Sequence, residues 1–284
     1  MRALITGGGG QLASDLVELL GDDAVAFSRA ELDVADADAV ARAIEAVAPD
    51  VVINCAAFHN LDLCEADPDQ AWAVNVRAVR EMAARAPRLV HLSTNYVFDG
   101  RRPEPYGEDD VPAPRSVYAI TKLAGEHAAL AYGSGALVVR AAGLYGVHGS
   151  VSKGGNFVQR MLARGREHGA LKMVADQLLQ PTFTADLATA IVDAVERDVD
   201  GVLHLTASDA CSWHEFTVAI MELAGSDVPV EAVSTVIPPG GIDRPLNGVL
   251  ARPRADALGL PALRSWREGL EDYMSRAGLA AQLR

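Results

Sequence analysis

The sequence predicts an α/β protein with a Rossmann-type doubly wound parallel sheet and a smaller, irregular α/β lobe at its C-terminal end. Short apolar runs alternate with amphipathic segments from Arg2 to about Arg140, and four glycines follow the first apolar run. This alternation is typical of βαβ units that build a parallel sheet. Glycines between a first strand and a first helix are typical of a loop that cradles phosphate.

The expected elements follow one another along the chain. Strands are predicted at residues 3–6, 24–27, 51–54, 89–92 and 137–139, and helices at 12–20, 37–47 and 70–85. These strands are too apolar for a sheet with one wet face, so helices are expected on both faces. Beyond residue 143, Gly and Pro separate helical segments at 156–166, 186–195, 213–223 and 265–275.

This change of pattern divides the chain into two parts. We assign residues 1–142 to a dinucleotide-binding domain and residues 143–284 mainly to a substrate-binding lobe, with room for a later segment to return to the sheet. Trp213 and Trp266 are interpreted as packing residues of the second lobe.

Composition excludes several classes of function. Acidic residues outnumber Lys plus Arg by 38 to 25, and the net charge of −13 repels nucleic acid and anionic membranes. Neither is expected as a partner, and no apolar run approaches the ~18 residues of a membrane span. A first strand at residue 3 leaves no room for a signal peptide. Three cysteines without a CxxC pair favour a reducing, cytoplasmic compartment and argue against zinc.

The glycine loop is the first candidate binding site. Gly7 to Ala13 match both a GxxGxxA and a GxGxxA pattern, in which glycines let the backbone approach a pyrophosphate at a helix N-terminus. A tight turn between strand and helix also favours glycine, which is the structural alternative. The expected contacts with the dinucleotide are made by Gly7, Gly10, Gln11 and Leu12 at the pyrophosphate and by Arg29, Asp33 and Val34 at the adenine and its ribose.

The choice of cofactor stays open at this point. An acid about 20 residues beyond the loop favours the ribose of NADH, whereas a nearby arginine favours the extra phosphate of NADPH. Asp33 and Arg29 supply both features.

A Tyr-x-x-x-Lys pair is the candidate catalytic site. Tyr118 and Lys122 lie four residues apart at the start of a helical segment, so both side chains leave one face of the helix. The chain holds only three lysines against 22 arginines, which makes a lysine at this spacing informative. A nearby ammonium stabilises a phenolate and lets the tyrosine exchange a proton. Thr94, just after the fourth predicted strand, could hold a carbonyl oxygen beside it; a surface helix pair and a simple turn are the alternatives.

With these residues in place, the chain resembles a known family. The shared motifs are Gly7 to Leu12, Asn54 to Ala57, Asn75, Ser93 to Gly100, Tyr118 to Lys122, Gly155 to Phe157, Asp176-Gln177, Pro181-Thr182, Arg244-Pro245 and Ser265 to Arg267. They look like the dTDP-4-dehydrorhamnose reductases, which are extended short-chain dehydrogenases. The resemblance implies that NADPH or NADH reduces the C4 keto group of a dTDP-4-keto-6-deoxy sugar, giving dTDP-L-rhamnose from dTDP-4-dehydrorhamnose.

The resemblance also implies roles for residues. Thr94, Tyr118 and Lys122 correspond to the catalytic triad, and Tyr118 supplies the proton. The residues implied to contact the cofactor at the end of the third strand are Cys55, Ala56 and Ala57. Those implied to contact the substrate are Asn95 and Tyr96 at the sugar; Asn156, Phe157, Gln177, Pro181 and Thr182 around the nucleotide diphosphate; and Arg244 at a phosphate, where its planar fork suits a bidentate contact.

Departures from the family pattern leave alternatives. Many members carry Asp in place of Asn95, Tyr in place of Phe58 and Trp in place of Gly143. One alternative is a non-catalytic subunit, because the regulatory subunit of methionine adenosyltransferase is similar to the same family. Another is a nucleotide-sugar epimerase or dehydratase, although dehydratases place an Asp-Glu pair after the threonine. Of the acidic residues through which some relatives bind Mg²⁺, only Asp15 has a match, so no metal is predicted; self-association is left open.

Overall fold

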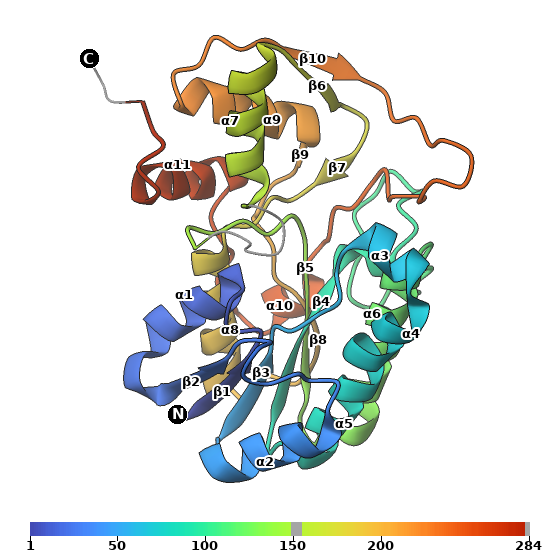
Figure 1. The fold of residues 1–284 in the computed structure, drawn as a ribbon, viewed down its shortest axis with the longest axis vertical. Helices are drawn as coiled ribbons and strands as arrows, with labels where there is room; N and C mark the ends of the chain where they lie inside the picture. The colour runs from blue at the N-terminus through green and yellow to red at the C-terminus, as the bar shows by residue number, and fades with distance from the viewer. Residues whose placement is uncertain (149–154, 282–284) are drawn as a thin grey trace.

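The central element is a six-stranded, fully parallel sheet in a computed structural model that describes residues 1–148 and 155–281 (Figure 1). Its order is β2-β1-β3-β4-β5-β8. β2 lies on one side of β1 and β3 on the other, so the direction in which successive strands are added reverses between β1 and β3. The carboxyl ends of β1 and β3 flank this reversal, which is where open α/β sheets bind ligands. The strands are β1 (Ala3–Thr6), β2 (Ala24–Phe27), β3 (Val51–Asn54), β4 (Leu89–Thr94), β5 (Leu137–Ala141) and β8 (Gly201–His204).

Helices cover both faces of the sheet, as its apolar strands require. Apolar residues of one face pack against α1 (Gln11–Leu20), α8 (Thr184–Glu196) and α10 (Pro253–Ala257). Those of the other face pack against α2 (Ala37–Val47), α5 (Ala78–Arg85) and α6 (Val117–Tyr132). β8 and α8 come from the second half of the chain and belong to the sheet and its covering layer. The division at residues 142 and 143 stays a prediction.

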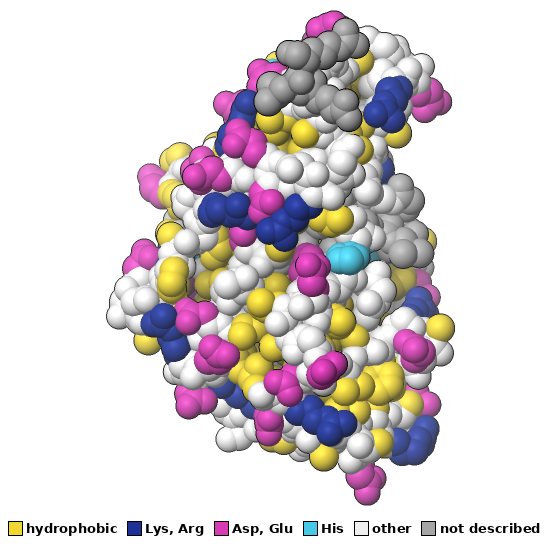
Figure 2. Space-filling view, turned by 90° about the vertical axis from the view of Figure 1, so that its left-hand side faces the viewer, with side chains coloured by type: hydrophobic (Ala, Val, Ile, Leu, Met, Phe, Trp, Pro, Cys, Tyr) yellow, Lys and Arg dark blue, Asp and Glu magenta, His cyan; other side chains and the backbone are white. Residues whose placement is uncertain are grey.

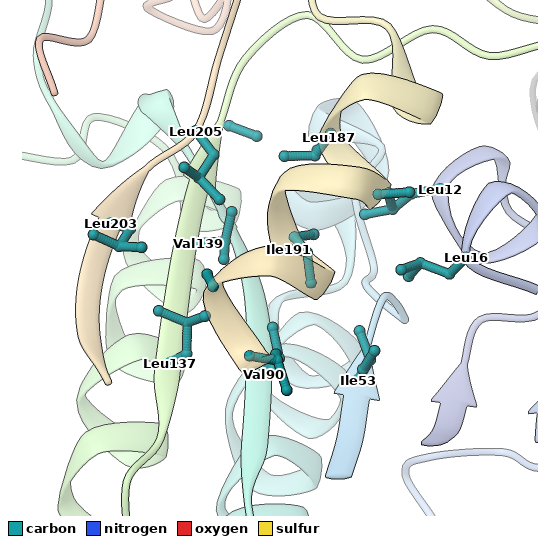
Figure 3. Packing of buried hydrophobic residues seen from close by; sticks show 14 of the residues in the cluster. Leu12, Leu16, Ile53, Val90, Leu137, Val139, Leu187, Ile191, Leu203 and Leu205 are labelled. Carbon is teal, nitrogen blue, oxygen red and sulfur yellow. The ribbon is translucent and has the colours of Figure 1, made fainter. Parts of the chain in front are cut away.

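The core between α1, α8 and the sheet is closely packed. Leu187 and Ile191 of α8 lie between the sheet and α1, near Leu12, Leu16 and Val139, as Figure 3 shows. These side chains are almost completely removed from water. Their burial fixes α1, and therefore the glycine loop before it, against the sheet.

The predicted helix at residues 70–85 is interrupted in the structure. After α3 (Leu61–Ala66) and α4 (Pro68–Trp72), the chain forms a π-helical turn at Ala73–Arg77 before α5. The turn carries Asn75, whose Oδ1 accepts from the N–H of Phe58 at 2.9 Å and whose Nδ2 donates to the carbonyl of Phe58 and to Thr121. Through Asn75, the π-helical turn connects the loop after β3 to α6 by hydrogen bonds. Such turns occur frequently at functional sites.

The second lobe is built on helices with strong N-terminal caps. α7 (Phe157–His168), α9 (Trp213–Leu223) and α11 (Trp266–Arg276) each begin at a capping box, formed by Asn156 and Gln159, Ser212 and Glu215, or Ser265 and Glu268. They enclose an aromatic core that includes Tyr145, Phe183 and Phe216. Two small sheets complete the lobe: β6 (Leu171–Val174) with β10 (Val230–Val233), and β7 (Leu178–Leu179) with β9 (Cys211–Ser212).

The surface, the cysteines and the helices each give one further finding. On the face drawn in Figure 2, acidic and basic side chains are interspersed with apolar ones. Cys55, Cys64 and Cys211 are free thiols. In residues 1–148 and 155–281, none of the helices combines the length and apolar character that a membrane span needs.

The packing of α8 predicts the effect of a truncation. Leu187→Ala removes a fully buried side chain between α8, α1 and the sheet, so we expect it to lower the free energy of unfolding by about 2–5 kcal/mol. Leu19→Ala, at a half-exposed position of α1, is the matched control and should cost less than about 1 kcal/mol. Urea unfolding measures both; equal losses would contradict this account of the core.

Candidate active site

A cavity of about 1190 Å³ lies at the carboxyl ends of the sheet strands and extends into the second lobe. Its floor consists of the segments that follow β3, β4 and β5, together with the start of α1 and the start of α6. Its opposite wall comes from α7, Trp213 and the segment after β10. The predicted site residues that line it are Gly10, Gln11, Leu12, Cys55, Ala57, Thr94, Asn95, Tyr96, Tyr118, Lys122, Asn156, Phe157, Gln177 and Arg244.

The glycine loop forms one end of this cavity. Gly7 has φ +73°, and a Cβ there would lie 2.9 Å from the backbone nitrogen of Ala56. The loop therefore crosses the end of β3 at a distance that only glycine allows. Gly10 is the N-cap of α1, and no side chain of the described residues caps this helix end. The positive end of the helix dipole faces the cavity, which suits an anion.

Tyr118 and Thr94 meet at the floor of the cavity. Ser116 accepts a hydrogen bond from the N–H of Ala119 and so starts α6, which places Tyr118 in the first turn. Thr94 ends β4, and its Oγ1 accepts from the N–H of Tyr96 at 3.2 Å. Burial raises the pKa of the Tyr118 phenol above its ordinary value, and a hydrogen bond with Thr94 opposes this. The Tyr118 phenol therefore keeps its proton and is neutral in the free protein.

Lys122 lies one turn further along α6 and is 1% exposed. Its Nζ donates to the carbonyl of Leu92 at 2.6 Å and lies 3.2 Å from Nε2 of His91. Burial lowers the pKa of Lys122 to about 8, although the Glu126 carboxylate opposes this. Glu126 is itself paired with Arg140 at 2.7 Å, and both are almost completely buried.

Three residues expected to contact substrate instead use their side-chain amides in hydrogen bonds within the protein. Nδ2 of Asn95 donates to the carbonyl of Gly248 at 3.0 Å, and Nε2 of Gln177 donates to Thr235 at 2.9 Å. Nδ2 of Asn156 donates to the carbonyl of Gly146 and to Tyr273, each at 2.8 Å, while its oxygen caps α7. These three residues form walls of the cavity, and their hydrogen bonds fix the shape of those walls.

Other predicted residues lie outside the lining of the cavity: Gly7, Arg29, Asp33, Val34, Ala56, Pro181 and Thr182. The Val34 side chain packs in the core with residues of α2 and the sheet, and its assignment to the cofactor stays a prediction. Thr182 is buried, where its Oγ1 donates to the carbonyl of Gln180 and accepts from the N–H of Ala207. Pro181 and Thr182 thus support the wall from behind. Arg29 and Asp33 are exposed beyond β2.

The structure adds residues that the sequence analysis missed. Arg160, Met161 and Arg164 line the cavity beside the predicted Phe157. Their spacing of three and four residues was the signal that could have identified them, because such positions share one face of a helix. Trp213, interpreted as a packing residue, both packs on Phe157 at a ring distance of 4.4 Å and lines the cavity.

Three ligand-type side chains gather beside α1. Asp15, Glu18 and His148 each offer one atom, and these atoms lie within 4.8 Å of one another. Asp15 is buried and burial raises its pKa, whereas the other two are exposed. Exposed acidic groups cluster in many proteins without binding metal, and the absence of a metal stays a prediction.

The fold and the cavity define the class of protein. A parallel sheet with a glycine loop after β1, and a Tyr-Lys pair at the start of α6 beside the end of β4, are the features of an extended short-chain dehydrogenase. The chain belongs to the RmlD substrate binding domain family, whose family model matches residues 1–278.

Relatives cover the whole length of the chain. It is 34% identical over 98% of its length to the spore coat polysaccharide biosynthesis protein SpsK of Bacillus subtilis, 99% of which is matched. It is 36% identical to the dTDP-4-keto-6-deoxy-D-glucose reductase of Streptomyces niveus, over 95% of both chains. The solved dTDP-4-dehydrorhamnose reductase of Bacillus anthracis in complex with NADP superposes with a TM-score of 0.89 at 33% identity, covering 97% of this chain and 99% of that one.

The geometry of the glycine loop predicts a difference between two glycines. Gly7→Ala places a Cβ against the end of β3 and strains a positive φ, so we expect at least a ~10-fold loss of NADPH affinity, or about 1.4 kcal/mol. Gly9→Ala meets no atom within 4 Å and should leave affinity within about twofold. Calorimetric titration measures both, and equal affinities would contradict the proposed role of Gly7.

Proposed function

We propose that this protein reduces the C4 keto group of a dTDP-linked 4-keto-6-deoxy sugar, with NADPH or NADH as the reductant. The observation that carries the proposal is the meeting of Thr94, Tyr118 and Lys122 in the same cavity as the glycine loop. Carbonyl reduction needs a proton donor and a bound dinucleotide, and candidates for both lie at the edge of the sheet where ligands of this fold bind. The names of relatives that reduce dTDP-linked keto sugars support the same reaction.

The residues of the loop fit a dinucleotide. The close crossing at Gly7 and the uncapped start of α1 leave backbone and dipole available to a pyrophosphate. When bound, the nicotinamide supplies the hydride. We assign the end of β3, at Cys55 and Ala57, to the adjoining wall of the cofactor site.

The chain's own residues then handle position and protons. Thr94 holds the carbonyl oxygen, Tyr118 gives its hydroxyl proton to that oxygen as it becomes an alkoxide, and Lys122 orients the ribose beside the nicotinamide. Each role needs only groups already fixed by β4 and α6. Such fixed placement supplies much of the rate enhancement in reactions of this kind.

The diphosphate of the substrate is assigned to the arginines of the second lobe. Arg160 and Arg164 on α7 and Arg244 line the cavity. Within the part of the chain that the structure describes, no carboxylate lies at ion-pair distance from any of the three. Unpaired guanidinium groups are free to bind phosphate oxygens in bidentate fashion.

Two further parts of the proposal concern the particular substrate and the compartment. The relatives are named for different dTDP sugars, so we propose dTDP-4-dehydrorhamnose as the first substrate to test. We also propose action in the cytoplasm, because the three cysteines are free thiols.

The assignment of Tyr118 as the proton donor predicts that its replacement lowers turnover. With dTDP-4-keto-6-deoxy-L-mannose generated in situ, Tyr118→Phe should lower kcat by about 10²- to 10⁴-fold, because general acid catalysis contributes this much. Cofactor affinity should change little. Tyr132→Phe, an exposed tyrosine at the end of the same helix, is the control. NADPH and NADH oxidation at 340 nm gives the rates.

Tight cofactor binding without turnover in the unaltered protein would contradict the reductase and favour the regulatory-subunit alternative. A purified sample that retains bound NAD and turns over without net oxidation would favour an epimerase.

The arginines of α7 predict an effect on substrate binding. Arg160→Ala removes a cation from the cavity, so KM for the nucleotide sugar should rise about 10-fold, with a smaller change in kcat. Arg166→Ala, on an exposed part of α7 outside the cavity, is the matched control. Initial rates at low and moderate salt test this. A rise of KM that is equal in both variants would contradict the assignment.

A further inference from the structure

One segment runs from the second lobe to the main sheet along the rim of the cavity. We call residues 236–242, which follow β10, the strap; Figure 1 draws this part of the chain in orange, leaving β10 and returning toward the main sheet. The strap residues that line the cavity are Val236, Ile237, Pro238, Gly241 and Ile242. These side chains carry no group that could take part in the proposed proton transfer.

The start of the strap is fixed to the second lobe. The carboxylate of Asp176 accepts from the N–H of Thr235 at 2.8 Å and from its hydroxyl at 2.7 Å. Nε2 of Gln177 donates to the same hydroxyl at 2.9 Å. Because these hydrogen bonds meet on the residue just before the strap, Thr235 is the first anchor.

The end of the strap is fixed to the loop after β4. The Asp243 carboxylate lies 3.2 Å from Nε of Arg115 and 3.6 Å from a guanidinium nitrogen of Arg101. Pro245 packs so closely on Gly100 that a Cβ on this glycine would overlap it. The second anchor therefore belongs to the sheet and its loops, whereas the first belongs to the second lobe.

Between the two anchors the strap has little support from the rest of the protein. Among the described residues, its backbone groups form a single hydrogen bond, from the N–H of Gly241 to the carbonyl of Pro238, which lies within the strap. Gly240 has φ +75°, and a Cβ there would meet no atom within 4 Å. Segments with few buried contacts and exposed backbone groups open at a low cost in free energy. The strap can therefore move while its ends stay in place.

The strap presents apolar side chains to the cavity that nothing covers. Val236 is 85% exposed and Ile237 is 48% exposed, although both line the cavity. The lining contributed by the second lobe includes further apolar and aromatic side chains, among them Met173, Val174 and Trp213. A ligand with apolar faces would remove this surface from water, which stabilises the bound state. The base and pentose of a nucleotide sugar offer such faces, whereas its diphosphate does not.

We propose that the strap closes over the nucleoside of the bound dTDP sugar, with Val236 and Ile237 as its contacts; this inference rests on the proposed function. Arg244 directly follows the second anchor and lines the cavity, which places the diphosphate at the fixed end of the strap. The nucleoside then lies beneath the movable part. Closure excludes water from the nucleotide and makes the nucleoside part of substrate recognition.

Hydrogen exchange of the full-length protein tests closure. Without ligand, the amides of Val236, Ile237 and Ile242 should exchange nearly as fast as those of an unfolded chain, because no hydrogen bond protects them. Saturating dTDP should slow them at least about 10-fold, since exchange then requires the strap to open. Inorganic pyrophosphate offers the arginines a diphosphate without a nucleoside and should leave them unchanged. Unchanged exchange in saturating dTDP, or equal protection by pyrophosphate, would overturn the proposal.

Two valines of equal exposure separate ligand contact from other effects. Val236→Ser removes apolar surface that closure buries, so Kd for dTDP should rise about 5- to 10-fold, and KM for the dTDP sugar by a similar factor, with little change in kcat. Val111→Ser, at an 86% exposed position outside the cavity lining, should leave both within about twofold. Calorimetric titration and initial rates measure these values. No rise in Val236→Ser, or the same rise in both variants, would contradict the contact.

The proposed reaction and the closing strap can fail separately. If dTDP slows exchange of the strap and no keto sugar is reduced, only the proposed reaction fails. If a keto sugar is reduced and exchange of the strap does not respond to dTDP, only the closing strap fails. A protein that binds no dTDP would overturn both.

Discussion

The close approach of α6 to β4 is the constraint on which the catalytic floor depends. A Cβ on Gly125 would overlap the carbonyl oxygen of Asn75 and come within 3.2 Å of His91 Nε2. Because glycine allows the helix this close, Lys122, one turn earlier, reaches the carbonyl of Leu92, and Glu126 reaches Ser93 and Arg140. Positions 118, 122 and 126 are separated by four residues each and follow one face of the helix. Tyr118 therefore enters the cavity from a helix whose distance from β4 is set at Gly125, two turns further along.

The second lobe adds arginine and further aromatic side chains to the groups at the end of the sheet. The sheet end offers backbone groups, hydroxyls and one buried lysine, all suited to a dinucleotide and a carbonyl. α7 adds cations on the opposite wall, where its Phe157 also packs against Trp213 of α9. Asn156 caps α7 and also bonds to Gly146 and Tyr273, so the helix start is fixed to the segment after β5. That fixed joint sets the width of the cavity between the two lobes.

The sequence predicted the features that depend on local spacing. The alternation of apolar runs located five of the six strands of the main sheet within one or two residues, and the Tyr-Lys spacing singled out Tyr118 and Lys122, which both line the cavity. Features that depend on tertiary contacts were missed. Nothing in the pattern at residues 70–85 shows that Asn75 must bond to Phe58, so the π-turn was read as a continuous helix. Val34 was assigned to the cofactor from its distance along the chain; the pattern did not show that its side chain packs in the core, and its assignment to the cofactor stays a prediction.

Under the proposed function, the distribution of charge along the cavity determines the orientation of the bound substrate. The chain carries a net charge of −13, yet Arg160, Arg164 and Arg244 line the wall formed by the second lobe. Lys122 at the floor is almost completely buried, and its Nζ donates to the carbonyl of Leu92. Under the proposed function, the diphosphate is therefore drawn to the arginines of the second lobe, and the uncharged keto group is left to Thr94 and Tyr118.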